Sequence, residues 1–160
     1  MSTTTIDLHE WLTCLTDVAT DFATNHLRFE NGAAPEAPAV AGGPAPAVYV
    51  AILGERSSMH LGLSTSTAGC QALARAFLGL RGRDALSDRE VVDGMNEILN
   101  ILAGKVKSRM STRDGSLKLG LPMFVAGTVG HGDGIEKSSS DVMLGPVACR
   151  LHVFRQSRSA

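Results

Sequence analysis

A long amphipathic segment from Ser87 to Met110 places the tightest constraint on how this chain can fold. Ser87 and Glu90 have the spacing of a capping box, in which the side chain of each accepts a hydrogen bond from the backbone N–H of the other. Asp88 and Glu90 also lie where acidic side chains favour the positive end of a helix dipole. The pattern predicts one helix up to about Met110. Its apolar side chains recur every three or four residues, at Val91, Met95, Ile98, Leu102 and Val106.

The other side of this predicted helix carries a narrow polar stripe. With Asp93 as origin and a turn of about 100° per residue, Glu97, Asn100 and Gly104 all fall within roughly 40° of it. A solvated face would account for each polar residue singly, but a glycine inside a helix costs about 0.5–1 kcal/mol relative to alanine. Asn100 is also a mediocre helix former, because its amide competes with the backbone for hydrogen bonds. We therefore interpret the stripe as a docking surface that lets another molecule approach closely.

The N-terminal part of the chain predicts one helix followed by a long loop. Apolar residues recur at helical spacing up to about Phe29, and Thr4 with Asp7 forms a weak capping box at the start. Residues 31–47 are rich in Ala, Pro and Gly, and their prolines block helix and strand alike. We expect a mobile loop there, longer than the usual limit of roughly 12–15 residues, within one domain that spans residues 1–160.

The remaining segments predict a further helix and a sheet. Ala47–Gly54 and Ser58–Ser64 have strand composition and the short separation of a hairpin, and Thr65–Leu80 has helical spacing. Four later runs have strand character: Leu117–Leu119, Phe124–Val129, Val142–Leu144 and Val147–Phe154. Thr128–Ser140 lacks the ending and the following helix of a phosphate loop, so we interpret it as a glycine-rich connection between strands. Hairpins outnumber crossovers, which favours an α+β fold: a mostly antiparallel sheet with long helices packed on it.

Charge and composition argue against several classes of function. The net charge is −1, and the Lys and Arg residues are scattered, so we expect no nucleic-acid partner. No apolar run reaches the roughly 18–20 residues that cross a bilayer, and residues 1–6 lack the pattern of a leader peptide, so we expect a cytoplasmic protein without membrane association. The three cysteines and five histidines are isolated along the chain, which disfavours a disulfide framework or a metal site. Each cysteine is interpreted as a small buried apolar residue.

Several of these residues resemble a known phosphatase family. Asp93-x-x-x-Glu97-x-x-Asn100 fits the D/S-x-x-x-E-x-x-N signature of the CheC/CheX/FliY phosphatases, and EILNILAG is similar to their active helix. Leu117–Gly127 resembles the segment after this helix in CheX-like proteins, and Val48–Ser64 resembles their leading hairpin. CheC-type members carry two copies of the signature. A single copy indicates a resemblance to the CheX-like branch, over roughly residues 48–154.

The resemblance implies a CheX-like fold, an activity and a partner. The activity would be hydrolysis of the aspartyl phosphate on a CheY-like response regulator, in chemotaxis or another two-component pathway. Asn100 would orient the attacking water and Glu97 would pair with the receiver's lysine, while Asp93 and Gly104 would belong to the docking surface. The chain would need no cofactor of its own, because the receiver domain holds the Mg²⁺. CheX-like proteins pair so that the sheet continues across two subunits, which implies a homodimer.

Two alternatives stay open at this point. In one, the chain is a binding module whose stripe docks a receiver domain without hydrolysis. In the other, it is an assembly component of the flagellar or chemotaxis apparatus, since strand-rich members of the family resemble parts of the flagellar switch. Hydrolysis of a phosphorylated regulator would separate the phosphatase from the binding module. Co-sedimentation with motor complexes, independent of Glu97 and Asn100, would favour the assembly component.

Overall fold

A computed structural model describes residues 5–30, 45–55, 58–80, 85–127 and 132–156 of the chain. Within these residues, three helices and the six strands of one sheet follow one another in the predicted order. The elements are α1 (Leu8–His26), β1 (Ala47–Leu53), β2 (Ser58–Ser64), α2 (Thr67–Leu78), α3 (Asp88–Met110), β3 (Lys118–Leu119), β4 (Met123–Val125), β5 (Ile135–Leu144) and β6 (Val147–Gln156). The prediction of an α+β fold with long helices on an antiparallel sheet is confirmed.

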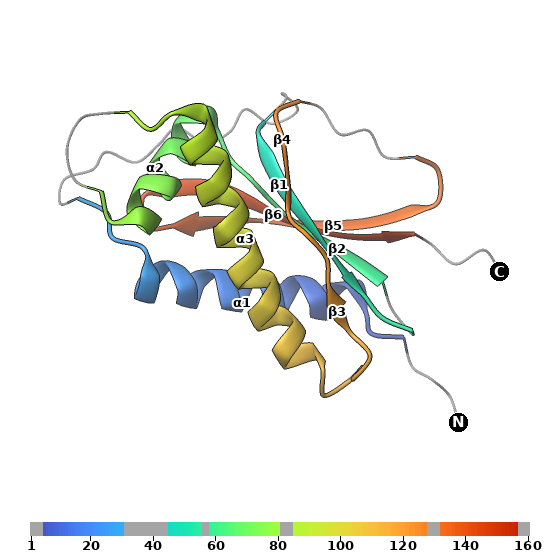
Figure 1. The fold of residues 1–160 in the computed structure, drawn as a ribbon. Helices are drawn as coiled ribbons and strands as arrows, with labels where there is room; N and C mark the ends of the chain where they lie inside the picture. The colour runs from blue at the N-terminus through green and yellow to red at the C-terminus, as the bar shows by residue number, and fades with distance from the viewer. Residues whose placement is uncertain (1–4, 31–44, 56–57, 81–84, 128–131, 157–160) are drawn as a thin grey trace.

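The strand pairs of the described residues are all antiparallel. The order across the sheet is β3-β1-β2-β6-β5, and β4 pairs with β1 on the same side as β3. The predicted β1–β2 hairpin is confirmed, with Val48 opposite Leu63 and Ile52 opposite Met59. Strand β6 pairs with β2, so the C-terminal hairpin joins the first hairpin in one continuous sheet (Figure 1).

The helices pack on one face of the sheet (Figure 1). Helix α1 lies against β5 and β6, α3 lies against β1, and α2 contacts both α3 and β6. The side chains of alternate strand residues point toward the helices, and Val50, Leu61 and Leu151 are at most 1% exposed. Within the described residues no helix covers the opposite face, where His60 and Arg150 are exposed. A functional surface can therefore lie on the outer side of the helices or on the open face of the sheet.

The predicted limits of α1 were wrong at both ends. The helix begins at Leu8, and Asp7 is its N-cap, with an extended backbone and no cap hydrogen bond from its side chain. Thr4 lies outside the described residues. The helix ends at His26 because Leu27, which is buried, continues in an extended conformation. The predicted apolar face is confirmed, since four of its members are at most 1% exposed: Trp11, Leu15, Val18 and Phe22.

Strand β5 corrects the interpretation of Thr128–Ser140 as a connection. Residues 135–140 form the first part of a ten-residue strand that pairs with β6 along its whole length. Ser138 and Ser140 lie on the face covered by α1, and Lys137 is exposed on the other face. The alternation of apolar and polar residues that marks a half-buried strand is therefore weak here, and serine has no strong preference for strands. Pairing with β6 decides the conformation.

The other predicted bounds need smaller changes. Helix α2 lies inside the predicted Thr65–Leu80 and ends at Leu78, because the next residue, Gly79, has a φ of 66°, in the left-handed region that glycine favours. Strand β4 begins one residue before the predicted Phe124 and ends at Val125 instead of Val129. The loop predicted over residues 31–47 lies mostly outside the described residues, and Ala47 already belongs to β1.

We expect the cysteine thiols of the folded protein to react slowly. Cys70 and Cys149 are buried, as predicted, and Cys14 is half-buried. Burial raises the pKa of Cys70 to about 11 and that of Cys149 to about 12, and it also raises the pKa of Cys14. Because the thiolate is the nucleophile, an aromatic disulfide reagent at pH 8 should label the native chain slowly and all three thiols rapidly after denaturation. Rapid labelling of the native protein would contradict this packing.

Candidate functional site

Helix α3 carries the predicted site residues, and its start is firmly held. The predicted capping box is confirmed: the Ser87 N–H donates to Glu90 Oε2 at 2.7 Å, and the Glu90 N–H donates to Ser87 Oγ at 3.2 Å. Gln71 of α2 holds the preceding residue, because it accepts from the Leu86 N–H at 3.1 Å and donates to the Leu86 carbonyl at 2.9 Å. The helix ends at Met110, as predicted. These contacts fix the beginning of α3 relative to α2.

Apolar burial fixes how α3 is rotated about its own axis. The predicted apolar flank is confirmed, since none of its five residues is more than 8% exposed. The buried arc is also wider than predicted, because Leu99 and Ala103 are fully buried beside it. With this arc turned toward the sheet and the neighbouring helices, the remaining arc of α3 must face outward.

The outward arc contains the four predicted site residues. Asp93 and Glu97 are exposed, while Asn100 and Gly104 are half-exposed, so the predicted outward direction of the stripe is confirmed. Within the described part of the chain, no hydrogen bond or ion pair engages the side chains of Glu97 and Asn100. A carboxylate and a carboxamide one helical turn apart are therefore both available to another molecule.

Asp93 has a partner that the sequence analysis did not consider. The Nε atom of Arg89 lies 4.0 Å from Asp93 Oδ2, and the two side chains are 92% and 72% exposed. Ion pairs with this exposure contribute roughly 0–1 kcal/mol, because water screens them. Asp93 can therefore exchange this contact for one with a docking partner at little cost.

The two glycines of α3 have different surroundings, one in open space and one in a helix contact. Beyond the backbone of its own helix and its chain neighbours, a Cβ atom at Gly104 would meet no atom of the described residues within 4 Å, so none of those residues requires glycine there. A Cβ atom at Gly94 would lie 2.9 Å from the Ala74 Cβ and 3.4 Å from its Cα, so glycine lets α2 approach α3. Gly94 was not predicted from the sequence, because it lies about 100° from Asp93, outside the polar stripe.

Asn96 is a polar residue of α3 that was also not predicted as part of the site. Its side chain is half-buried, and its Oδ1 atom is shielded from solvent and has no hydrogen-bond donor among the residues that the structure describes. The signal that could have identified it is its spacing, since it precedes Asn100 by four residues and thus lies on the same side of the helix.

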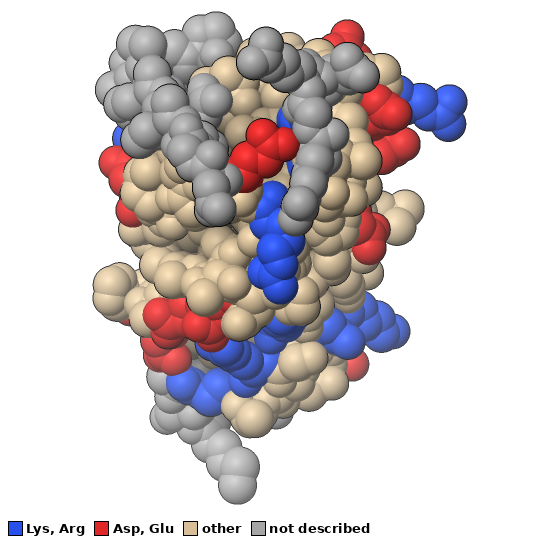
Figure 2. All heavy atoms as spheres, turned by 90° about the vertical axis from the view of Figure 1, so that its left-hand side faces the viewer, with Lys and Arg blue, Asp and Glu red and all other residues tan. Residues whose placement is uncertain are grey.

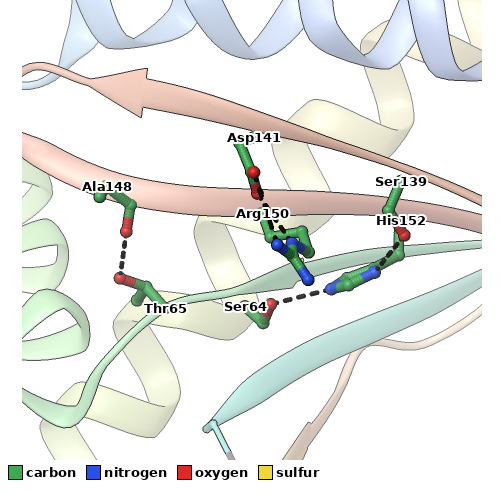
Figure 3. A network of polar contacts seen from close by, with 7 residues as sticks. All are labelled: Ser64, Thr65, Ser139, Asp141, Ala148, Arg150 and His152. Carbon is green, nitrogen blue, oxygen red and sulfur yellow. Dashed lines mark hydrogen bonds and ion pairs between the residues drawn. The ribbon is translucent and has the colours of Figure 1, made fainter. Parts of the chain in front are cut away.

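The open face of the sheet holds a second group of polar residues (Figure 3). His152 is 7% exposed, and its two ring nitrogens lie 2.8 Å from Ser64 Oγ and 2.9 Å from Ser139 Oγ. These contacts join β2, β6 and β5. Arg150 Nε donates to Asp141 Oδ1 at 2.7 Å, and this hydrogen bond lowers the pKa of Asp141. Since both ring nitrogens are engaged by the sheet itself, we assign this network a structural role.

The charged and metal-binding residues give no second candidate. Acidic and basic side chains are intermixed on the molecular face seen in Figure 2. The described residues contain no group of three or more His, Cys, Asp and Glu side chains placed to hold a metal ion. None of their helices combines the length and apolar character needed to cross a membrane.

Comparison with known proteins relates this geometry to one family. The family described as "Chemotaxis phosphatase CheX" matches residues 47–138. A solved structure of the chemotaxis protein CheX from Vibrio vulnificus is similar, with 17% identity, a TM-score of 0.67, and 94% of this chain and 99% of that chain covered. A CheX–CheY–BeF3–Mg complex from Borrelia burgdorferi gives 15% identity and a TM-score of 0.66, with coverage of 94% and 99%. CheX from Desulfovibrio desulfuricans gives 16% identity and a TM-score of 0.64, with coverage of 92% and 98%. No curated protein sequence matches the chain.

Alanine at the two glycines of α3 should change stability in opposite directions. Gly94→Ala should destabilise the fold by about 1–3 kcal/mol, because the new methyl group forces α2 and α3 apart. Gly104→Ala is the matched control and should stabilise the fold by about 0.5–1 kcal/mol, because it improves helix propensity in open space. Urea unfolding of both variants measures the difference. Equal shifts of the same sign would refute the assignment of Gly94 to the helix contact and of Gly104 to the outer surface.

Proposed function

The chain belongs to the CheX family of chemotaxis phosphatases, and from this premise we propose that it hydrolyses the aspartyl phosphate of a CheY-like response regulator. The observation that carries the proposal is the outward stripe of α3, on which Glu97 and Asn100 lie one turn apart and unengaged within the described residues. The similar fold of the CheX chain in the Borrelia burgdorferi complex, whose other protein is named CheY, supports a receiver domain as the partner.

The reaction requires a correctly placed water molecule more than a strong base. An aspartyl phosphate is a reactive mixed anhydride. Water attacks phosphorus, the bond between phosphorus and the carboxylate oxygen breaks, and the products are inorganic phosphate and the aspartate carboxylate. Asn100 is suited to this task, because its Oδ1 can accept a hydrogen bond from the attacking water while its Nδ2 donates to a second group. Holding the water in line with the breaking bond lowers the activation barrier by several kcal/mol.

Glu97 sets the register of docking in this proposal. Its exposed carboxylate pairs with the lysine of the receiver site, and such a charge-assisted hydrogen bond strengthens when docking excludes water. Gly104 lets the receiver backbone approach α3 closely, because no side chain stands in the way. Asp93 adds a further acidic contact at the same surface.

The chain's own residues bind and position, and the Mg²⁺ of the reaction belongs to the receiver. The metal neutralises charge on the phosphoryl group when the receiver is loaded. Because receiver domains act in two-component signalling, we place the encounter in the cytoplasm, within chemotaxis or a related pathway.

The exposed edge of the sheet supports a homodimer in which the sheet continues across two chains. Strand β5 is ten residues long and, within the described residues, pairs only with β6. Its other edge offers a row of backbone N–H and C=O groups to a second copy. The opposite edge is formed by β3 and β4, which are only two and three residues long.

Hydrolysis of a phosphorylated regulator tests the proposed activity. Wild type should release phosphate from a purified phosphorylated receiver faster than the receiver loses it alone. Asn100→Ala should lower the rate about a hundredfold, because the water is no longer oriented. Glu97→Gln should raise the chain concentration needed for half-maximal rate about tenfold, because the contact with the lysine weakens.

A matched control separates loss of the site from general damage. Asn25 of α1 has an exposed carboxamide that, among the described residues, donates to the Asp21 carbonyl one turn earlier, so Asn25→Ala should retain the wild-type rate. If wild type is no faster than Asn100→Ala, the chain is a binding module instead of a phosphatase. Co-sedimentation with motor complexes that survives both site substitutions would identify an assembly component.

The oligomeric state tests the continuous sheet. Light scattering at micromolar concentration should give twice the mass of one chain. Asn100→Ala and Glu97→Gln should leave this mass unchanged, because α3 lies against β1, and strands β2 and β6 separate β1 from β5 in the sheet. A single-chain mass over the whole concentration range would remove the dimer from the proposal.

A further inference from the structure

Asn96 stands out because its side chain has a hydrogen-bonding atom without a partner. Its Oδ1 atom is shielded from water and accepts no hydrogen bond from the described residues, although the residue as a whole is only half-buried. An acceptor in this state destabilises a fold, because it has lost its hydration and gained nothing in exchange. Asparagine is also a weak helix former, so helix propensity does not explain its place in the middle of α3.

The position of Asn96 relative to Asn100 indicates a partner for the Asn96 side-chain oxygen. The two residues are four apart in one continuous helix, so their Cβ atoms are neighbours at about 5–6 Å on the helix surface. Side chains in a helix lean toward its N-terminus, so the Asn100 carboxamide extends over the turn that bears Asn96. Both residues are partly exposed, but only the side-chain oxygen of Asn96 is shielded from solvent. Asn96 is therefore the member of the pair nearer the protein interior, and Asn100 is the member nearer the solvent.

We propose that Asn96 is a positioning residue that sets the orientation of the Asn100 carboxamide in the docked complex; this inference rests on the proposed phosphatase function. A carboxamide can turn either its oxygen or its nitrogen toward the attacking water, and only the oxygen can accept a hydrogen bond from it. The Asn96 oxygen can accept from Asn100 Nδ2 but offers nothing to Asn100 Oδ1. It therefore selects the orientation in which Asn100 Oδ1 faces the water.

The local surroundings of Asn100 strengthen this assignment. Glu97 is the other acceptor within one turn, but in the proposed complex its carboxylate pairs with the receiver's lysine. Within the described residues, nothing else engages the Asn100 side chain. Among the described residues, the acceptor at Asn96 is therefore the group that remains for Asn100 Nδ2 when the receiver is bound.

The test compares Asn96→Ala with wild type in single-turnover hydrolysis of a phosphorylated receiver. Asn96→Ala should lower the saturated rate about tenfold and leave the half-saturating concentration unchanged, because orientation and not docking is lost. Asn96→Asp keeps an acceptor oxygen in the same place and should restore most of the rate. Urea unfolding should show Asn96→Ala to be at least as stable as wild type, because an unsatisfied acceptor has been removed.

A double-substitution cycle shows whether Asn96 acts through Asn100. In the Asn100→Ala background, Asn96→Ala should have no further effect on the rate, because there is no carboxamide left to orient. Multiplied effects in the double variant, an unchanged rate in the single variant, or a loss of stability in Asn96→Ala would each overturn the inference. An inactive wild type would overturn the proposed function itself, so the two failures are distinguishable.

Discussion

The packing of α3 against the sheet and α2 is the constraint on which the candidate site depends. Each residue of a helix points about 100° away from its neighbour, so the buried arc decides which side chains can face outward. The full burial of Met95, Ile98 and Leu102 holds that arc against the core, and the close approach of Ala74 to Gly94 prevents the helix from turning. Glu97 and Asn100 thus owe their direction to apolar residues on the far side of the helix.

Stability and the proposed function are divided between the two sides of this helix. Three residues with low helix propensity lie on or beside the outer side, namely Asn96, Asn100 and Gly104. The capping box of Ser87, the hydrogen bonds from Gln71 and the buried arc offset that loss without reaching the outer surface. Rigidity also serves the proposed chemistry, because a water molecule can be held in line only by groups that do not themselves move.

Sequence reasoning succeeded where one local signal was strong and failed where partners from elsewhere in the chain decided. The limits of α3 were predicted closely because a capping box and a long apolar period coincide. Strand β5 was missed because its serines and charged residues become a strand only by pairing with β6. Asn96 and Gly94 were missed because a missing hydrogen-bond donor and a close contact with Ala74 exist only between packed elements.

Local sequence patterns were enough to predict the α+β class, the first hairpin, and the shared stripe of Asp93, Glu97, Asn100 and Gly104, because helix geometry and hydrophobic periodicity are local properties. Tertiary structure alone decided that this stripe faces outward and that Gly94 serves the α2 contact. It also brought the C-terminal hairpin into the same sheet as the first. Burial and pairing depend on residues far apart in the chain, and local pattern carries no information about which of them will meet.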